Sequence, residues 1–131
     1  MYWIESIEDG LKWLARKSWG RKKRGAFYRR LAVYVENGIA PRQAVRRLLD
    51  QVRGRYPNPD GFLASMDVDA LALNEIHYRL ANGELLTQAL VGWAPASELS
   101  IIRAGEGSGD LPDALRSVLQ GSDIVAKVVI R

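Results

Sequence analysis

The sequence predicts an all-α protein, an antiparallel helical bundle of about six or seven helices built from helix hairpins. Apolar residues recur at helical spacing along most of the chain, and no segment shows the strict alternation of a β-strand. Asn-Gly pairs end two of these periodic segments, as they do at helix C-termini. With 131 residues, 47% of them apolar, the chain is long enough for one domain with its own core.

The first predicted element is an amphipathic, basic leader helix within residues 1–24. Leu11 and Leu14 share one face, acids lie near its start and bases near its end, which suits the helix dipole. Trp13 and Trp19 widen the apolar face, and we favour packing against the bundle over a place on a membrane surface. The bases that form the predicted patch are Arg16, Lys17, Arg21, Lys22, Lys23 and Arg24. Such a patch suits nucleic acid, an anionic membrane or an acidic partner, and the alternative is a solvated charged face.

The next two helices are predicted to form a hairpin around Asn37 and Gly38. Asn-Gly is a strong helix stop, and Pro41 opens the second helix because its first turn needs no amide donor. The segment after Pro41 carries a continuous apolar stripe at Ala44, Val45, Leu48, Leu49 and Val52. So short a connection predicts that the two helices are antiparallel neighbours.

A second hairpin is predicted after the connector "RYPNPDGF", whose prolines and glycine exclude a regular helix. Residues 67–82 form one helix, Asn82 and Gly83 form the turn, and residues 84–93 form the next helix. The units "NGIAPRQAV" and "NGELLTQAL" share Asn-Gly, Gln-Ala and an aliphatic residue at the same offsets. The chain is therefore expected to repeat one helix-turn-helix pattern.

The last hairpin is predicted around "RAGEGSGDLPDAL", after a helix that follows Pro95. Gly105 is expected to end that helix in left-handed geometry, and Ser108 or Asp110 to cap the next helix, which continues towards the end of the chain. A phosphate-binding loop is disfavoured, because no strand precedes the glycines and no Lys-Ser/Thr pair follows them. Glu106 is interpreted as a turn residue or a cap for a neighbouring helix, or else as a contact that fixes how the hairpins dock.

The residue types for common catalytic and metal sites are scarce. There is no cysteine and His77 is the only histidine, so we predict no metal site and no cofactor. No nucleophile elbow, paired-carboxylate signature or zinc-binding motif is present, and we predict that the protein is not an enzyme. An open alternative is a helical nucleic-acid-binding domain that uses the basic N-terminal region, although no cluster of base-reading Asn or Gln accompanies it.

The segments "FYRRLAVYVENGIAPRQAVRRL", "ANGELLTQAL" and "IIRAGEGSGDLPDAL" resemble the type II secretion system F domain. This domain occurs in inner-membrane platform proteins of type II secretion and type IV pilus assembly. The likeness covers residues 25–121, and residues 122–131 are expected to be a helical extension towards a transmembrane segment. The most specific part is the Gly-Glu-x-Ser-Gly-x-Leu run, whose members here are Gly105, Glu106, Ser108, Gly109 and Leu111.

The resemblance implies a scaffold at the cytoplasmic face of the bacterial inner membrane. The family couples a cytoplasmic assembly ATPase to pilin assembly, by binding and without catalysis. The expected partners are that ATPase, other inner-membrane pilus or secretion components and further copies of the chain, with membrane attachment through transmembrane helices that the sequence lacks. The short leader resembles the pilus branch, including type IVb and conjugative thin pili, and nucleic acid is the disfavoured partner.

Overall fold

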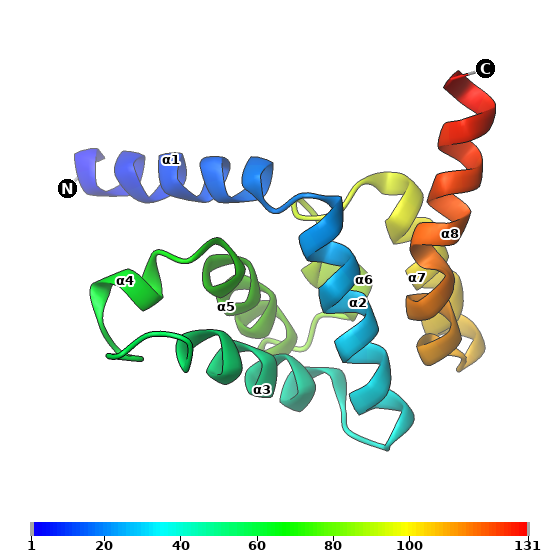
Figure 1. The fold of residues 1–131 in the computed structure, drawn as a ribbon, viewed down its shortest axis with the longest axis horizontal. Helices are drawn as coiled ribbons and strands as arrows, with labels where there is room; N and C mark the ends of the chain where they lie inside the picture. The colour runs from blue at the N-terminus through cyan, green and yellow to red at the C-terminus, as the bar shows by residue number, and fades with distance from the viewer. Residues whose placement is uncertain (1, 131) are drawn as a thin grey trace.

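The computed structural model describes the backbone of residues 2–130 and the side chains of residues 9–120. Within this range the chain is an all-α bundle with no strand, as predicted (Figure 1). No helix in the described part combines the length and the apolarity that a bilayer crossing requires. In chain order the helices are α1 (Tyr2–Ser18), α2 (Arg21–Glu36), α3 (Pro41–Arg53), α4 (Phe62–Ser65), α5 (Val68–Ala81), α6 (Leu86–Ala89), α7 (Ala96–Ser108) and α8 (Leu111–Ile130).

Three helix pairs carry most of the packing: α3 with α5, α2 with α8, and α7 with α8. In Figure 1, α2 and α8 run side by side in opposite directions, and α7 and α8 form a hairpin. By contrast, α3 runs away from the end of α2 at a steep angle, so the prediction of an antiparallel α2–α3 pair is wrong. The chain changes direction between the two helices at the left-handed Gly38 and the extended Ala40 (φ −61°, ψ 147°).

The core contains apolar residues of α2, α3, α5, α7 and α8. All five members of the predicted stripe on α3 are buried, which confirms the helical face read from the sequence. The core also includes Leu31, Ile76, Ile102, Leu115 and Val118, each at most 1% exposed. The connector remains irregular from Gly54 to Gly61 and then forms the single turn of α4.

Both predicted Asn-Gly turns are present with the same backbone geometry. Gly38 (φ 84°) and Gly83 (φ 89°) adopt the left-handed conformation that favours glycine. The amide of Ile39 donates to the Tyr34 carbonyl at 3.0 Å, and the amide of Glu84 donates to the Arg79 carbonyl at 3.1 Å. These bonds satisfy carbonyls that a helix end would otherwise leave without a partner.

The two units differ after their turns. The first leads into the long α3, whereas the second leads into α6, which ends at Ala89. Gly92 (φ 89°) forms a further left-handed turn, so the predicted helix over residues 84–93 is too long. Trp93 is part of this turn, and its side chain is buried in the core.

The segment predicted as one leader helix belongs to two elements. Helix α1 ends at Ser18, and the last four basic residues of the segment form the first turn of α2. Ala15 and Trp19 are buried against the bundle, which supports packing of this end of α1. At the other end of the chain, the α8 backbone continues to Ile130, while the side chains of the predicted extension lie outside the described residues.

Candidate interaction site

A buried carboxylate joins α7 to the start of α2. Glu98 is 1% exposed, and Arg24 donates to both of its oxygens, from Nε at 2.8 Å and from Nη2 at 2.9 Å. The Tyr28 hydroxyl donates to the same carboxylate at 2.7 Å. Arg24 also reaches back to the Trp19 carbonyl at 3.0 Å, so the α1–α2 junction is fixed by the same side chain. Such a two-point arginine–carboxylate contact is strongly directional.

Burial and the Glu98 carboxylate together set the protonation of Tyr28. Burial raises the pKa of the phenol, and its hydrogen bond to the anionic Glu98 raises it further. For Arg24, burial acts to lower the pKa, but the contact with Glu98 outweighs it and the pKa is raised overall. Arg24 therefore remains a cation, and Tyr28 remains a neutral donor.

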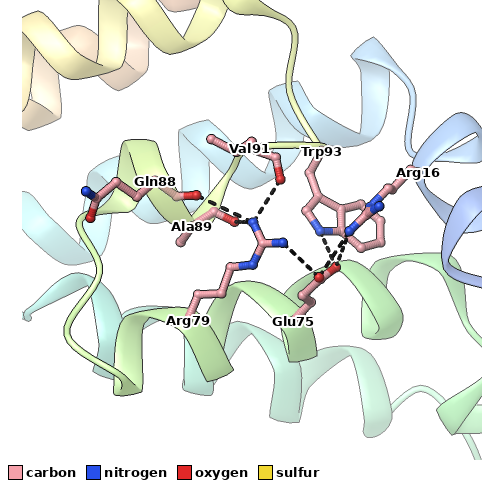
Figure 2. Close-up of polar contacts among 7 residues, drawn as sticks. All are labelled: Arg16, Glu75, Arg79, Gln88, Ala89, Val91 and Trp93. Atoms are coloured by element: carbon pink, nitrogen blue, oxygen red, sulfur yellow. Dashed lines mark hydrogen bonds and ion pairs between the residues drawn. The ribbon is translucent and has the colours of Figure 1, made fainter. Parts of the chain in front are cut away.

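A second carboxylate, Glu75 on α5, collects three donors (Figure 2). Arg16 of α1 contacts it at 3.1 Å, Arg79 of α5 at 3.0 Å, and the indole Nε1 of Trp93 at 2.6 Å. The Arg16 guanidinium also lies over the Trp93 ring, 5.6 Å from its centroid. Glu75 therefore links α1, α5 and the loop after α6.

The short helix α6 is held at both ends by side chains from other helices. At its N-terminus, the Glu106 carboxylate accepts hydrogen bonds from the amides of Leu86 and Thr87, both at 2.9 Å, and from the Thr87 hydroxyl. At its C-terminal end, Arg79 donates to the carbonyls of Ala89 and Val91, the latter at 2.9 Å (Figure 2). Glu106 thus caps a neighbouring helix, one of the interpretations that the sequence left open.

The glycine run has a different geometry from the one predicted. Gly105 lies inside α7, and it is Gly109 (φ 77°) that ends the helix in left-handed geometry. A Cβ at position 105 would overlap the Cβ of Ala114 on α8, so this glycine allows α7 and α8 to approach closely. Ser108 donates to the Gly105 carbonyl within α7 and does not cap the next helix. Leu111 opens α8 and is half-buried against the core.

The predicted basic patch does not form one surface. Arg16 forms an ion pair with Glu75, and Arg24 forms one with Glu98. Both arginines therefore stabilise the fold. Arg21 donates to the Leu119 carbonyl of α8 at 3.1 Å. The ammonium of Lys17 lies over the exposed ring of Trp13, 4.2 Å from its centroid. Lys17 belongs to α1, whereas Lys22 and Lys23 belong to α2. Lys22 and Lys23 are exposed on the first turn of α2.

Lys22 and Lys23 stand at the rim of a cleft of about 540 Å³ between the α1–α2 junction, α3 and α5. We call this feature the basic cleft. Its apolar floor consists of Trp19, Phe27, Leu48, Val52 and Leu73. Pockets of this size and composition commonly accommodate ligands or the side chains of partners.

The rim of the basic cleft is strongly cationic. Its charged members are Arg21, Lys22, Lys23, Arg30, Arg55 and Asp69. Asp69 is engaged on two sides, by the Trp19 indole at 3.0 Å and by Arg55 at 3.5 Å. The first turn of α2 contains no acidic residue, and the dipole of α2 adds positive potential at this end of the helix. The rim therefore attracts anionic groups.

His77 lies half-buried on α5, near exposed arginines of α3. Burial lowers the pKa of its imidazole, and the charges of Arg46 and Arg42 lower it further, with Asp50 acting in the opposite direction. His77, Arg42 and Arg46, with Gln43 and Arg47, line a shallow hollow of about 330 Å³. Among the described side chains, no group of three or more His, Asp or Glu is placed to hold a metal ion.

Glu75, Glu98 and the basic cleft were not found by sequence reasoning. For Glu98 a signal exists, because it lies four residues before the buried Ile102 and therefore on the inward face of α7. The partners could not be identified in the same way, since Arg24 and Glu98 are 74 residues apart. The floor of the cleft depends on how α2 crosses α3 and α5, which helical periodicity does not specify.

Comparison with known proteins adds no relative. No family model matches the chain, and neither curated proteins nor solved structures give a match.

Proposed function

We propose that this chain is a cytoplasmic scaffold domain of an inner-membrane platform protein, the alternative being a helical nucleic-acid-binding domain that uses the basic N-terminal region. In this role it couples an assembly ATPase to pilin assembly in a type IV pilus, including the type IVb and conjugative thin pili, or in a type II secretion system. The observation that carries the proposal is the basic cleft, a surface with an apolar floor and a cationic rim that suits partner binding. The F-domain-like run from Gly105 to Leu111 supplies the assignment to these machines.

The contacts of that run support a scaffold role. Gly105 permits close packing of α7 on α8, and Glu106 holds α6 in place. Glu98 and Glu75 attach the α1–α2 junction to the rest of the bundle. The α1–α2 junction beside the basic cleft is therefore held in a fixed position, as a docking surface requires.

Binding to the assembly ATPase encoded with this protein tests the proposal. Isothermal titration calorimetry of the purified chain with the purified ATPase should give saturable binding. In a matched titration, the same chain should give no heat of binding with the ATPase of an unrelated secretion machine. A chain that is folded by circular dichroism and gives no heat of binding with its own ATPase would contradict the proposed function.

The hollow around His77 favours a second candidate, nucleic-acid binding. Arg42, Arg46 and Arg47 are exposed along α3, which follows the turn at Gly38. A helix-turn-helix protein likewise presents basic side chains from its second helix to DNA. Fluorescence anisotropy with generic duplex DNA at physiological salt separates the candidates. Tight binding that weakens steeply with salt would favour the nucleic-acid function over the scaffold.

A further inference from the structure

We propose that the basic cleft binds an acidic amphipathic helix of a partner protein. The inference rests on the proposed scaffold function and adds the chemistry of the partner segment and the place where it binds. Its two supports are the apolar floor and the sign of the charges around it.

The floor offers sites for apolar anchors between helices. Phe27 of α2, Leu48 and Val52 of α3 and Leu73 of α5 face one space of about 540 Å³. A partner helix inserts apolar residues into such a groove at positions i, i+3 or i+4, and i+7. Ala26, also in the lining, is small and leaves the α2 side of the cleft open to an inserted side chain.

The cationic rim of the basic cleft favours an anionic occupant. Lys22, Lys23 and Arg30 are exposed at its α2 side. On the opposite side Asp69 is already paired with Arg55, so the lining offers an incoming segment a net positive charge. Glutamates and aspartates on the polar face of a partner helix would complement these cations, and complementary charges raise both specificity and the rate of association.

The geometry of the floor disfavours the other anionic partners. Its aromatic rings already pack edge-to-face, with the centroids of Trp19 and Phe27 5.5 Å apart. They present no open ring face for the stacking of nucleic-acid bases. A lipid surface would meet the lysines, but its flat headgroup layer would leave the concave apolar floor unfilled.

The test uses a fluorescein-labelled helical peptide with leucines at i, i+3, i+4 and i+7 and glutamates on its other face. Its anisotropy is measured with the wild-type chain and with the variant K22E/K23E. We expect saturable binding to the wild type and an affinity at least about tenfold lower for the variant. A second variant, Ala26→Phe, fills the cleft without changing charge and should also weaken binding.

A matched control has the same change of charge elsewhere. Arg42 and Arg47 are exposed on α3 and do not line the basic cleft. The variant R42E/R47E should retain the affinity of the wild type. Circular dichroism of each variant confirms that it is folded, and a peptide with lysines in place of the glutamates should not bind.

Four results would overturn the proposal: no binding of the acidic peptide, equal losses in K22E/K23E and R42E/R47E, equal binding of acidic and basic peptides, or unchanged binding to Ala26→Phe. Vesicles that contain phosphatidylglycerol, and duplex DNA, are titrated in parallel. Preferential binding of either one that is lost in K22E/K23E would assign the cleft to a membrane or to nucleic acid instead.

The calorimetric experiment with the assembly ATPase separates this inference from the proposed function. If the ATPase binds wild type and K22E/K23E equally well, the scaffold function stands and the assignment of the cleft fails. If the peptide binds in the cleft but the ATPase does not bind the chain, the cleft assignment stands and the ATPase is not its partner.

Discussion

Glu98 sits almost completely out of water, a position that is costly for a carboxylate unless each oxygen has a partner. Arg24 and Tyr28 supply those partners from α2, with hydrogen bonds of 2.7 to 2.9 Å. Removing the carboxylate would leave the half-buried Arg24 guanidinium without its counterion, and breaking a buried ion pair costs about 3–5 kcal/mol. Exposed pairs such as Arg46 with Asp50 contribute far less.

Tyr28 should make the protein sensitive to alkaline pH. Its pKa in the folded state is raised above the ordinary value, so its stabilising contribution is complete below about pH 10 and is lost as pH rises further. We expect the unfolding free energy in urea to fall above about pH 10, and Tyr28→Phe to reduce this slope. The same substitution at the exposed Tyr78 should leave the slope unchanged. Identical slopes for wild type and Tyr28→Phe would exclude the assigned role.

Gly109 should tolerate no β-branched residue, because its left-handed backbone disfavours any Cβ. Gly109→Val is expected to lower the unfolding free energy by about 1–2 kcal/mol. Gly107 has open space around its Cβ position and lies within α7, so Gly107→Val should have little effect. Thermal denaturation of both variants measures the difference, and equal melting temperatures would contradict this explanation.

At the scale of elements, α6 shows how a helix too short to be stable by itself is maintained. Four residues cannot offset the cost of helix nucleation. Glu106 of α7 satisfies its first amides, and Arg79 of α5 satisfies carbonyls at its other end. The structure of α6 is therefore supplied by its neighbours.

Glu106→Ala should release the N-terminus of α6 selectively. The loss of a capping carboxylate costs about 1 kcal/mol, and the amides of Leu86 and Thr87 would lose their acceptor. Hydrogen exchange followed by NMR should show faster exchange at these two amides, with α3 unchanged. The control is Glu84→Ala, which removes an exposed carboxylate two residues before α6. Equal exchange at Leu86 in both variants would argue against capping by Glu106.

The sequence was informative wherever structure depends on near neighbours. The stripe on α3 and the turns at Gly38 and Gly83 followed from spacing and backbone chemistry. The left-handed position was assigned to Gly105 instead of Gly109, because several glycines in one run are equally able to adopt it. Only the packing of α7 on α8 distinguishes them, since a side chain at position 105 would overlap Ala114.

At the scale of the molecule, α1 is attached differently from the other long helices. It packs against α5 at the edge of the bundle, whereas α2 and α7 both pack on α8 (Figure 1). Its described attachments are the buried Ala15 and the Arg16 contact with Glu75. The α1–α2 junction also forms part of the basic cleft, which no local pattern predicted because α3 and α5 complete it.

Arg16→Ala should loosen α1 before the rest of the bundle. The substitution removes the ion pair with Glu75 and the contact with the Trp93 ring, while the Arg24–Glu98 pair remains. Hydrogen exchange should accelerate at the amides of the last turns of α1 by about tenfold, with little change in α8. Lys17→Ala, which changes an exposed neighbour, serves as the control. Uniform acceleration across all helices would show that α1 does not open independently.

The close approach of α7 and α8 at Gly105 fixes the positions of these two helices relative to each other. Helix α8 continues well past this contact (Figure 1). A rotation of α8 would therefore displace α7, because the two backbones leave no room for a side chain between them at Gly105. Helix α7 carries Glu106, which binds α6, and Glu98, which binds Arg24 in the first turn of α2. A displacement of α7 would therefore act on both of these elements. The first turn of α2 also carries Lys22 and Lys23 of the basic cleft, so α8, α7 and one side of this cleft form one connected series of contacts.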